Sequence, residues 1–468
     1  MRERLEDFLH RYGVSPRKGF LPDGEPLRRL CDPYYEPWED LVADLPRHIL
    51  DERARWKIDE LPILDPARLI SQAEWRRAYV ILGFLTHAYI WGGEEPSERL
   101  PPQLTCPFLA VSEHLGLPPT ATFSTLSLWN FRLESPDKDP IKAENLRSLL
   151  SFTDTGDEEW FYMISTAIEA KGAPLISTML RCIEAVDANN DCVVLSGLRS
   201  ITSGIQDIGK LLQRMHERCD PQVFYHNVRP FCAGTKGMAA AGLPRGVFYD
   251  QGKGQGQWRQ YSGGSNAQSS LIQLFDIFLS VDHNTPGRQE PSQPTSVVAR
   301  VRAKGYLQVG HAIKRPASGA SFQVDSNPLQ EMRDYMPKPH RDFLSAVEQS
   351  SNVRDYVLTN ATTLSAELVA AYNDAVAALA NLRNIHIQIV ARYIVMPSRS
   401  PPAPYIASRK WKNLATACSK KSAEEADGNT SMTRQLHGTG GTSVMPFLKK
   451  TRDETARTTI PADCTTRS

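Results

Sequence analysis

Residues 365–396 read SAELVAAYNDAVAALANLRNIHIQIVARYIVM, with neither glycine nor proline before Pro397. This stretch predicts one long helix. One face of that helix collects residues spaced by three and four positions, namely Leu379, Leu382, His386, Ile389 and Tyr393. An imidazole on an otherwise apolar face either costs burial free energy or binds something. The segment therefore suggests both a helical fold and a functional residue.

Helical periodicity also dominates the rest of the chain. An amphipathic stripe runs through Ile201, Ile205, Ile208, Leu212 and Met215. Further helices are predicted over residues 73–91, 160–170, 265–281 and 339–348. Few segments alternate as strands do, and residues 296–301 are the weak exception. We therefore predict an all-α fold.

The chain has 468 residues, which is too long for one small core and predicts two domains, with three as the alternative. The stretch SFTDTGDEE (151–159) interrupts two helices and marks the expected boundary. We predict a small N-terminal helical domain over 1–152 and a large one over 153–455.

Segments without periodicity interrupt this pattern. Residues 253–261 are rich in glycine and glutamine. Residues 283–328 are expected to be a surface insertion, and 397–437 a mobile loop. Residues 456–468 are expected to be a disordered tail.

The composition excludes several classes of protein. Lys plus Arg is 54 and Asp plus Glu is 53, without a strong basic run, so no nucleic-acid partner is expected. The start MRERLEDFLHRYGVS lacks an apolar signal core, and the apolar run at 78–91 is too short for a bilayer. None of the eight cysteines forms a C-x-x-C pair. These features predict a cytoplasmic protein with reduced thiols and no membrane partner.

Known motifs of metal and hydrolase sites are incomplete or absent in this sequence. Asp187, Asn189 and Asp191 resemble the opening of a calcium loop, but its glycine and final glutamate are missing, so a turn beside a helix is expected. His216 and Cys219 have zinc half-site spacing without a partner pair. No G-x-S-x-G or H-E-x-x-H motif occurs. No residue is predicted to act as a catalytic acid or base.

A lone histidine on an apolar helix is more often a hydrogen-bonded core residue, and His87 is interpreted in this way. If His386 does bind a cofactor, that cofactor must supply most of the metal ligands itself. Haem fits, because its porphyrin fills four positions and leaves an axial one for an imidazole. Arg383 lies one turn earlier and either pairs with a haem carboxylate or is solvated.

Several long stretches carry a more specific signal. They are SGLRSITSGIQDIGKLLQRMHERCDP (196–221), FYHNVRPFCAGTKG (224–237), YSGGSNAQSSLIQLFDIFL (261–279), MRDYMPKPHRDFL (332–344), LRNIHIQIVARYI (382–394) and GTGGTSVMPFLKKTRDET (438–455). Together with a weaker match at 117–131, these stretches resemble the indoleamine 2,3-dioxygenase family, of a fungal type. The resemblance implies a small helical domain capping a large haem domain.

The resemblance also implies an activity. His386 would be the proximal ligand of a haem b iron, and the iron would bind O2 on its other face. Both oxygen atoms would enter the indole C2–C3 bond of L-tryptophan, giving N-formylkynurenine. This is the first step of tryptophan catabolism by the kynurenine pathway, which feeds NAD biosynthesis. A reductant system and a monomeric protein are expected.

Residue roles follow from the same resemblance. Arg229 matches the arginine that binds the substrate carboxylate, and Phe224 the aromatic residue that packs on the indole. Ser165 matches a small distal polar residue, with no histidine or acid aligned beside it. Thr439 matches a loop residue that closes over the site. The remaining pocket wall is expected from Phe123, Leu126, Ser127, Phe161, Gly264, Ser265 and Asn266.

The chain departs from the family pattern in a few places. Asn266 stands where the family usually has a small apolar residue, and Leu126 and Cys232 also vary the lining. The stretch 283–328 is longer than expected. Two other functions stay open: a non-catalytic haem protein that binds O2 on the same fold, and a helical scaffold without a cofactor.

Overall fold

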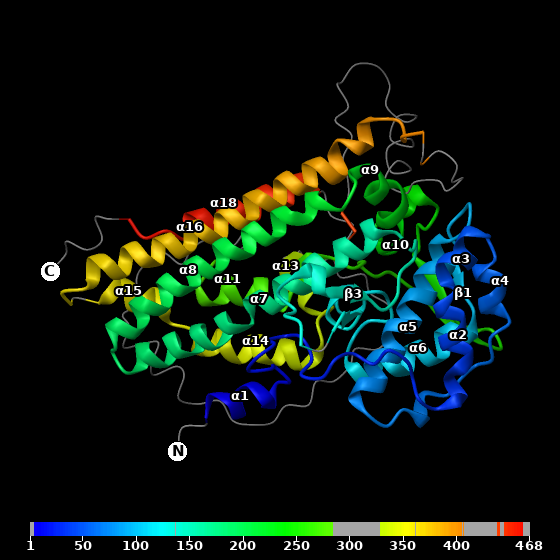
Figure 1. Cartoon of the computed structure of the whole chain (residues 1–468), viewed down its shortest axis with the longest axis horizontal. Coiled ribbons are helices and arrows are strands. Elements are labelled where there is room, and N and C mark those ends of the chain that lie inside the picture. The colour runs from blue at the N-terminus through cyan, green and yellow to red at the C-terminus, as the bar shows by residue number, and fades with distance from the viewer. Residues whose placement is uncertain are drawn as a thin grey trace.

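The computed structural model describes residues 4–283, 328–404, 406, 438–439 and 444–461, apart from 136 and 361. Figure 1 shows an elongated molecule, with shorter helices gathered at one end and long helices running along the main axis. The helices of the first third are α1 (Leu5–Arg11), α2 (Glu36–Ala43), α3 (Leu45–Leu50), α4 (Ala54–Asp59), α5 (Gln72–Trp91) and α6 (Pro102–Leu115).

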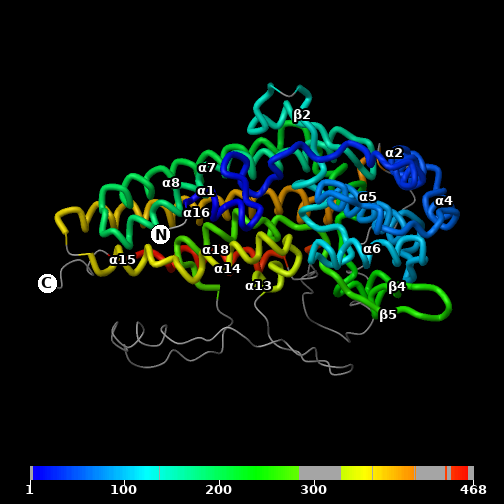
Figure 2. Tube along the Cα trace, turned by 90° about the horizontal axis from the view of Figure 1, so that it is seen from below, coloured from blue at the N-terminus to red at the C-terminus, as the bar shows by residue number. Residues whose placement is uncertain are grey.

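The long helices form the body of the molecule. The helix α16 packs against α8 and α18, and α7 packs against α8 (Figures 1 and 2). The α-helices here are α7 (Gly156–Asp187), α8 (Asp191–Gln213), α9 (Pro221–Val223), α10 (Arg229–Cys232), α11 (Ser270–Phe278), α13 (Pro328–Arg333), α14 (Lys338–Ser350), α15 (Val353–Thr359), α16 (Ser365–Val390) and α18 (Val444–Arg457). The all-α prediction is confirmed. Within the described residues, no helix combines the length and the apolar surface needed to cross a bilayer.

The opening segment of the sequence analysis forms α16 as predicted. Its expected face is buried at Leu379, Leu382, Ile389 and Tyr393. Beyond Val390 the chain continues as a π-helical turn, η9 (Ala391–Val395), so the helical path reaches almost to Met396. The spacing argument therefore gave the correct face over the whole segment.

Helix ends differ from the predictions where caps were overlooked. The helix expected over 160–170 is the much longer α7, which begins after the cap Thr155 and continues through Pro174. The helix expected over 265–281 is two elements, the 3-10 turn η8 (Asn266–Gln268) and α11. Ser269 separates them, because its hydroxyl accepts the backbone N–H of Ile272 and starts a new helix.

Short strands were missed in the glycine-rich stretch. β4 (Val247–Gly252) and β5 (Gln255–Arg259) form an antiparallel hairpin, and β1 (Arg99–Leu100) pairs with β4 in parallel. The hairpin turns through Lys253 and Gly254, which both have positive φ, at 53° and 75°. Such a turn matches the twist of paired strands. A second antiparallel pair joins β2 (Phe131–Leu133) to β3 (Leu146–Ser148).

Buried apolar residues form two clusters that do not follow the predicted boundary at residue 152. One cluster contains Phe152 and Trp160 together and so crosses the boundary. The other contains the long helices and also residues from the N-terminus, including Phe20. The Phe20 ring lies 5.7 Å from that of Phe343 on α14. The division into two domains stays a prediction.

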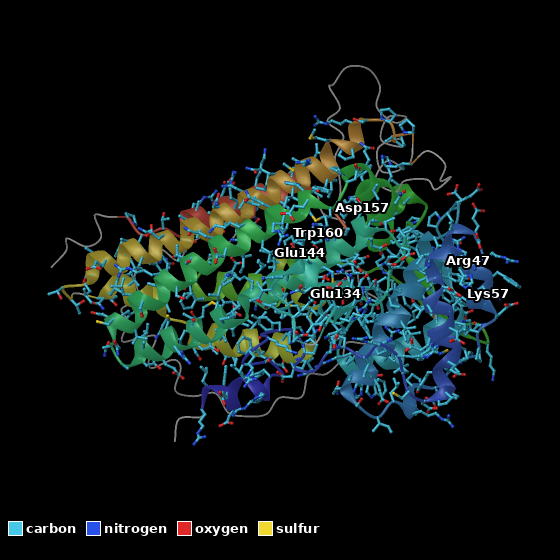
Figure 3. The ribbon with its side chains drawn as sticks, in the orientation of Figure 1. Arg47, Lys57, Glu134, Glu144, Asp157 and Trp160 are labelled. Carbon is cyan, nitrogen blue, oxygen red and sulfur yellow. The ribbon has the colours of Figure 1, made fainter. Side chains whose placement is uncertain are left out.

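The start of α7 is fixed by charged and aromatic contacts (Figure 3). Trp160 donates its indole N–H to the carbonyl of Arg214 at 2.9 Å. Arg214 in turn pairs with Glu144 and Glu217, and the guanidinium of Arg218 lies 4.7 Å from the Trp160 ring. Figure 3 shows Glu144, Asp157 and Trp160 in the middle of the molecule, away from Arg47 and Lys57 on the terminal helices.

The turn expected near Asp191 is present between α7 and α8. Asn190 caps α8 by accepting the N–H of Val193. The Asp191 carboxylate accepts hydrogen bonds from the side chains of Tyr356, Asn360 and Thr362. His216 contacts the Tyr393 hydroxyl at 3.2 Å. In the described ranges no group of His, Cys, Asp and Glu has the arrangement of a metal site.

A buried acid on α7 was not anticipated. Glu169 is 2% exposed, and one of its oxygens accepts a hydrogen bond of 2.5 Å from the hydroxyl of Ser269. The other oxygen, Oε2, has no hydrogen-bond partner within the described part of the chain. Loss of water around the carboxyl raises the pKa of Glu169 to about 7.

Glu169 should therefore make the fold sensitive to pH. Its pKa is raised on folding, so its burial becomes a growing cost as the pH rises from the unfolded value toward 7. We compare the free energy of unfolding of Glu169→Gln with that of the wild type. We expect this difference to change by about 3 kcal/mol in favour of the variant as the pH rises from ~4 to ~8. Urea unfolding of both proteins at several pH values measures this, and a pH-independent difference would contradict it.

Candidate active site

One cavity of about 290 Å³ gathers every residue proposed from the sequence for the site. Its walls come from α7, α8, α16, α18 and the turns between them. The predicted residues that line it are Phe123, Leu126, Ser127, Phe161, Ser165, Phe224, Arg229, Gly264, Ser265, Asn266, Arg383, His386 and Thr439. Apolar side chains of α8 and α16, such as Ile208 and Leu379, form much of the remainder. Their individual roles stay predictions.

His386 lacks the contacts of an ordinary core histidine. Its ring makes no hydrogen bond with any described residue, although it lies on the cavity-lining face of α16, near the C-terminal end of that helix. Burial, with a smaller effect of Arg383, lowers its pKa to about 4, so the imidazole is neutral at physiological pH. A neutral imidazole with an available nitrogen is what a metal ion requires.

His87 shows the opposite arrangement. Its Nδ1 lies 2.7 Å from the carbonyl of Phe231, and its Nε2 accepts the N–H of Ala121 at 3.0 Å. Both ring nitrogens are therefore used within the core, as expected for this histidine. Because the His386 ring lacks the hydrogen bonds that the His87 ring makes, the comparison favours a role for His386 in binding a cofactor.

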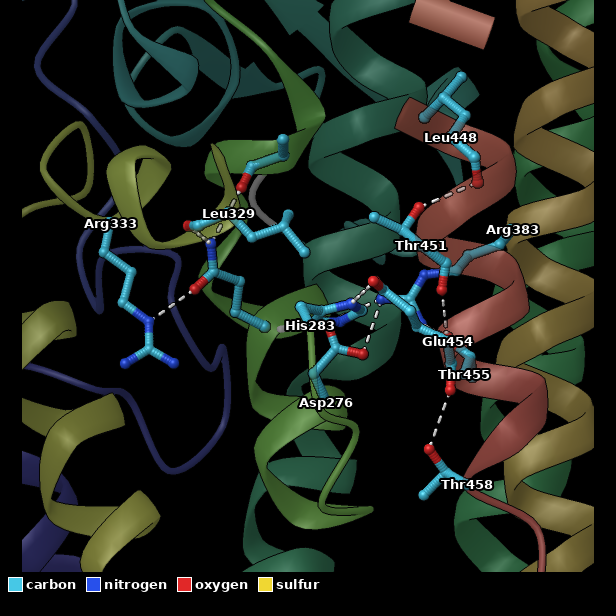
Figure 4. Close-up of polar contacts among 12 residues, drawn as sticks. Asp276, His283, Leu329, Arg333, Arg383, Leu448, Thr451, Glu454, Thr455 and Thr458 are labelled. Carbon is cyan, nitrogen blue, oxygen red and sulfur yellow. Dashed lines mark hydrogen bonds and ion pairs between the residues drawn. The ribbon is translucent and has the colours of Figure 1, made fainter. Parts of the chain in front are cut away.

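An ion-pair network joins α16 to α11 and α18 through Arg383, about one helical turn before His386 (Figure 4). The guanidinium of Arg383 donates to both carboxylate oxygens of Asp276 on α11, each at 2.7 Å. It also contacts the hydroxyl of Thr455 on α18. Asp276 and Arg383 are about a tenth exposed or less. A haem carboxylate bound here would share the guanidinium with Asp276.

His283 extends the network to the C-terminal helix. Its Nδ1 lies 2.8 Å from Glu454 on α18, and its Nε2 lies 3.3 Å from Asp276. Burial opposes the charge of His283, but hydrogen bonds to the two carboxylates outweigh it and raise the pKa of the ring. Only the two ends of the expected insertion are described: His283 makes these contacts, and Pro328 begins α13. The insertion itself stays a prediction. The rest of that stretch, and residues 407–437, lie outside the described residues.

Aromatic rings pack together along one wall of the cavity. The ring centroids of Phe161 and Phe224 lie 4.8 Å apart, and Tyr393 meets Phe224 edge-on at 5.7 Å. Arg229 follows Phe224 closely in sequence, is 7% exposed, and has its guanidinium 5.6 Å from the ring of Tyr225. A flat apolar group could pack against this aromatic surface.

Several cavity residues come from π-helical turns, in which one extra residue per turn shifts side chains sideways. These turns are η3 (Ser124–Leu128), η6 (Phe224–Val228) and η9 (Ala391–Val395). Turns of this kind are rare and occur frequently at functional sites. No periodicity argument could have located them, because they break the periodicity on which it depends.

Thr439 closes one side of the cavity through backbone contacts. Its carbonyl accepts the N–H groups of Gly234 at 3.1 Å and Gly263 at 3.0 Å. Its hydroxyl donates to the carbonyl of Gly264 at 3.1 Å. A Cβ at Gly234 or Gly263 would lie about 2.1–2.2 Å from backbone atoms, so only glycine permits this approach. Residues 440–442 of the predicted loop lie outside the described residues.

Polar side chains of the wall come from separate elements. The hydroxyl of Ser165 on α7 lies 3.4 Å from the carbonyl of Phe161 and 3.5 Å from Oδ1 of Asn266. Glu169, one turn beyond Ser165, also lines the cavity. An acid therefore does lie near Ser165, and the four-residue spacing of Phe161, Ser165 and Glu169 was a signal that sequence reasoning overlooked. No comparable signal marked Asp276, His283 or Glu454.

These features fit haem. The cavity is mostly apolar, as a porphyrin requires, and His386 offers a neutral nitrogen. Among the described residues, no group of three or more His, Cys, Asp or Glu side chains could hold a metal ion without such a cofactor. Arg383 and Arg229 supply positive charge at its wall. His386 would hold the iron, and the apolar residues of α8 and α16 would enclose the ring.

Comparison with known proteins agrees with this fit. A family model described as indoleamine 2,3-dioxygenase matches residues 8–458. Indoleamine 2,3-dioxygenase acdA of Aspergillus candidus is 41% identical over 98% of this chain and 100% of its own length. Indoleamine 2,3-dioxygenase of Saccharomyces cerevisiae is 39% identical over 96% and 93%. The 6-hydroxytryptophan 2,3-dioxygenase fscD of Fusarium equiseti is 37% identical over 95% and 96%. The chain belongs to the indoleamine 2,3-dioxygenase family and is a haem dioxygenase.

Proposed function

We propose that this protein inserts both atoms of O2 across the indole C2–C3 bond of L-tryptophan to give N-formylkynurenine. In this role it catalyses the first step of the kynurenine pathway, which feeds NAD biosynthesis. One observation carries the proposal. An imidazole without a hydrogen-bond partner in the described chain, that of His386, shares an apolar cavity with the buried guanidinium of Arg229. The first suits an iron and the second suits the carboxylate of an amino acid.

The cofactor that we propose is haem b, held by His386, with Arg383 available to a haem carboxylate. Bound haem iron would supply the oxygen chemistry, and the protein supplies placement and electrostatics. The Arg383–Asp276 pair fixes α16 against α11 and so holds His386 in place. No side chain needs to act as an acid or base.

Arg229 would bind the substrate carboxylate. In a mostly apolar cavity, a charged pair is weakly screened and therefore strong. The guanidinium can also donate two parallel hydrogen bonds, which fixes the orientation of the carboxylate. The amino acid would thereby be held with its indole against the rings of Phe161 and Phe224.

The remaining wall residues would shape the cavity and exclude water. Phe123, Leu126 and Ser127 lie on or beside the turn η3, and Gly264 and Ser265 lie opposite Leu126. A Cβ at Gly264 would approach Leu126 Cδ1 to 2.5 Å, so glycine keeps this part of the wall open. Thr439, bound to Gly263 and Gly264, would close the site over the substrate.

The working state that we propose is a cytoplasmic monomer served by an external reductant, without a membrane or nucleic-acid partner. The cysteines of the described residues are all free, which supports a reducing compartment. The Fusarium equiseti relative is named for 6-hydroxytryptophan, so a ring-substituted tryptophan is a second candidate substrate. A haem protein that only bound O2 would not need Arg229 in the cavity.

Replacing His386 tests the cofactor assignment. We expect His386→Ala to lose haem after expression with ample haem supply, because no other described histidine lines the cavity. The visible absorption spectrum measures haem per chain. His114→Ala, at an exposed histidine stacked on Trp75, is the matched control and should keep its haem. Full haem occupancy in His386→Ala would overturn the assignment.

Replacing Arg229 tests the substrate. We expect Arg229→Ala to keep the haem spectrum and to raise KM for L-tryptophan roughly thirtyfold or more, since loss of a buried charged partner costs about 2–5 kcal/mol. Arg229→Lys keeps the charge but not the two parallel donors, so its KM should lie between those of the wild type and Arg229→Ala. Absorbance of N-formylkynurenine, with ascorbate and methylene blue as reductants, gives the rates. An unchanged KM would mean that the carboxylate binds elsewhere.

A further inference from the structure

The C-terminal helix α18 buries polar side chains where a helix usually buries apolar ones. It packs mainly against α16. Four of its residues line the cavity, namely Val444, Phe447, Leu448 and Thr451. Apart from Val444, its buried residues are Thr451, Glu454 and Thr455. Because burial of hydroxyl and carboxyl groups gains little from the hydrophobic effect, hydrogen bonds and charges decide how firmly this helix is held against the cavity.

His283 joins α18 to α11 from a position between two carboxylates (Figure 4). Its Nδ1 lies 2.8 Å from Oε2 of Glu454 on α18, and its Nε2 lies 3.3 Å from Oδ2 of Asp276 on α11. The His283 side chain is 9% exposed, and each of the two carboxylates is 8% exposed. An ionised carboxylate only accepts hydrogen bonds, and a neutral imidazole has a single N–H. Only the doubly protonated ring therefore offers a donor to each carboxylate.

The charged groups around His283 come from three helices. They are Asp276 of α11, Arg383 of α16, and Glu454 and Lys450 of α18, with the exposed Asp282 beside the ring in the chain. The guanidinium of Arg383 balances one of the two buried carboxylates. Lys450 is 43% exposed and lies 3.6 Å from Glu454, so water screens its charge. A proton on His283 balances the second buried carboxylate, and loss of that proton leaves it without a buried cation.

We propose that His283 is a positioning residue whose protonated ring holds α18 against α11, and that loss of its proton loosens α18 from the cavity. The residue acts through Glu454 and Asp276 and needs no contact with substrate or iron. The inference goes beyond the proposed function, because it concerns how one wall of the cavity is closed and does not depend on which indole is oxidised.

The pH dependence has a definite sign. Burial lowers the pKa of His283, but the hydrogen bond and charge of Asp276, together with the hydrogen bond to Glu454, outweigh it and raise the pKa above 6.5. A raised pKa means that the docked helix binds the proton more tightly than the undocked one. The stabilisation is therefore fully present below pH ~6.5 and is lost as the pH rises through the raised value. Glu169, with a pKa of about 7, titrates in the same range, so the test compares proteins at equal pH.

The test measures how often α18 leaves its place. Hydrogen–deuterium exchange of the amides of α18 is followed in the haem-loaded full-length protein and in His283→Gln, between pH ~5.5 and pH ~9. The ratio of the two rates at one pH cancels the intrinsic exchange rate and the contribution of Glu169. We expect α18 of the variant to exchange roughly tenfold faster at pH ~6, as for loss of one charge-assisted hydrogen bond, and the ratio to approach one as the pH rises. A ratio of one throughout, or a raised ratio that is independent of pH, would overturn the inference.

A second variant removes the other side of the contact. Glu454→Gln should exchange in α18 as fast as His283→Gln at pH ~6, and the double variant should be no faster than either, because both changes break the same contact. His114→Gln is the matched control, since it removes an exposed imidazole and should keep the wild-type pH dependence. Wild-type pH dependence in Glu454→Gln would count against the proposal. The visible spectrum verifies that each variant is folded with haem. Since exchange requires no turnover, failure to cleave tryptophan would refute the proposed function alone.

Discussion

The buried ion pair between Arg383 and Asp276 is the contact on which the cavity depends. It joins α16, which carries His386, to α11, and through Thr455 and His283 it reaches α18. Removing one partner of such a pair costs about 3–5 kcal/mol, because the other charge stays buried. His283 and Glu454 balance the charges of the network, so two cations face two carboxylates when the histidine is protonated. The position of the proposed iron ligand is therefore set by electrostatics between helices as well as by packing.

The cavity itself arises where regular structure is interrupted. The π-helical turns η3, η6 and η9 each contribute residues to its wall, and each turns side chains away from the positions that an α-helix would give them. The long regular helices form a rigid frame, and the π-helical turns determine the shape of the cavity wall. This division explains why Phe224 and Arg229 both reach one cavity although neither lies on a long helix.

The sequence was sufficient to predict the helical fold and to single out His386, which lines the cavity. The spacing of Leu379, Leu382 and His386 gave the correct face of α16, because a long helix without glycine or proline has one period. Local caps were harder to recognise: Ser269 splits the helix expected over 265–281.

Contacts between segments that are distant in the sequence could not be predicted from it. His283 and Glu454 are 171 residues apart, and nothing near either residue indicates the other. Individual roles in the cavity came from a family resemblance, since spacing alone cannot show that Ser127, Ser165 and Asn266 line the same cavity.

The closure at Thr439 has a consequence for how this enzyme can diversify. Two of its three bonds run from the N–H groups of Gly234 and Gly263 to a main-chain carbonyl, so they persist whichever amino acid stands at position 439. The anchoring of position 439 is therefore independent of its side chain. A substitution there can change which side chain lines the cavity while both backbone hydrogen bonds remain.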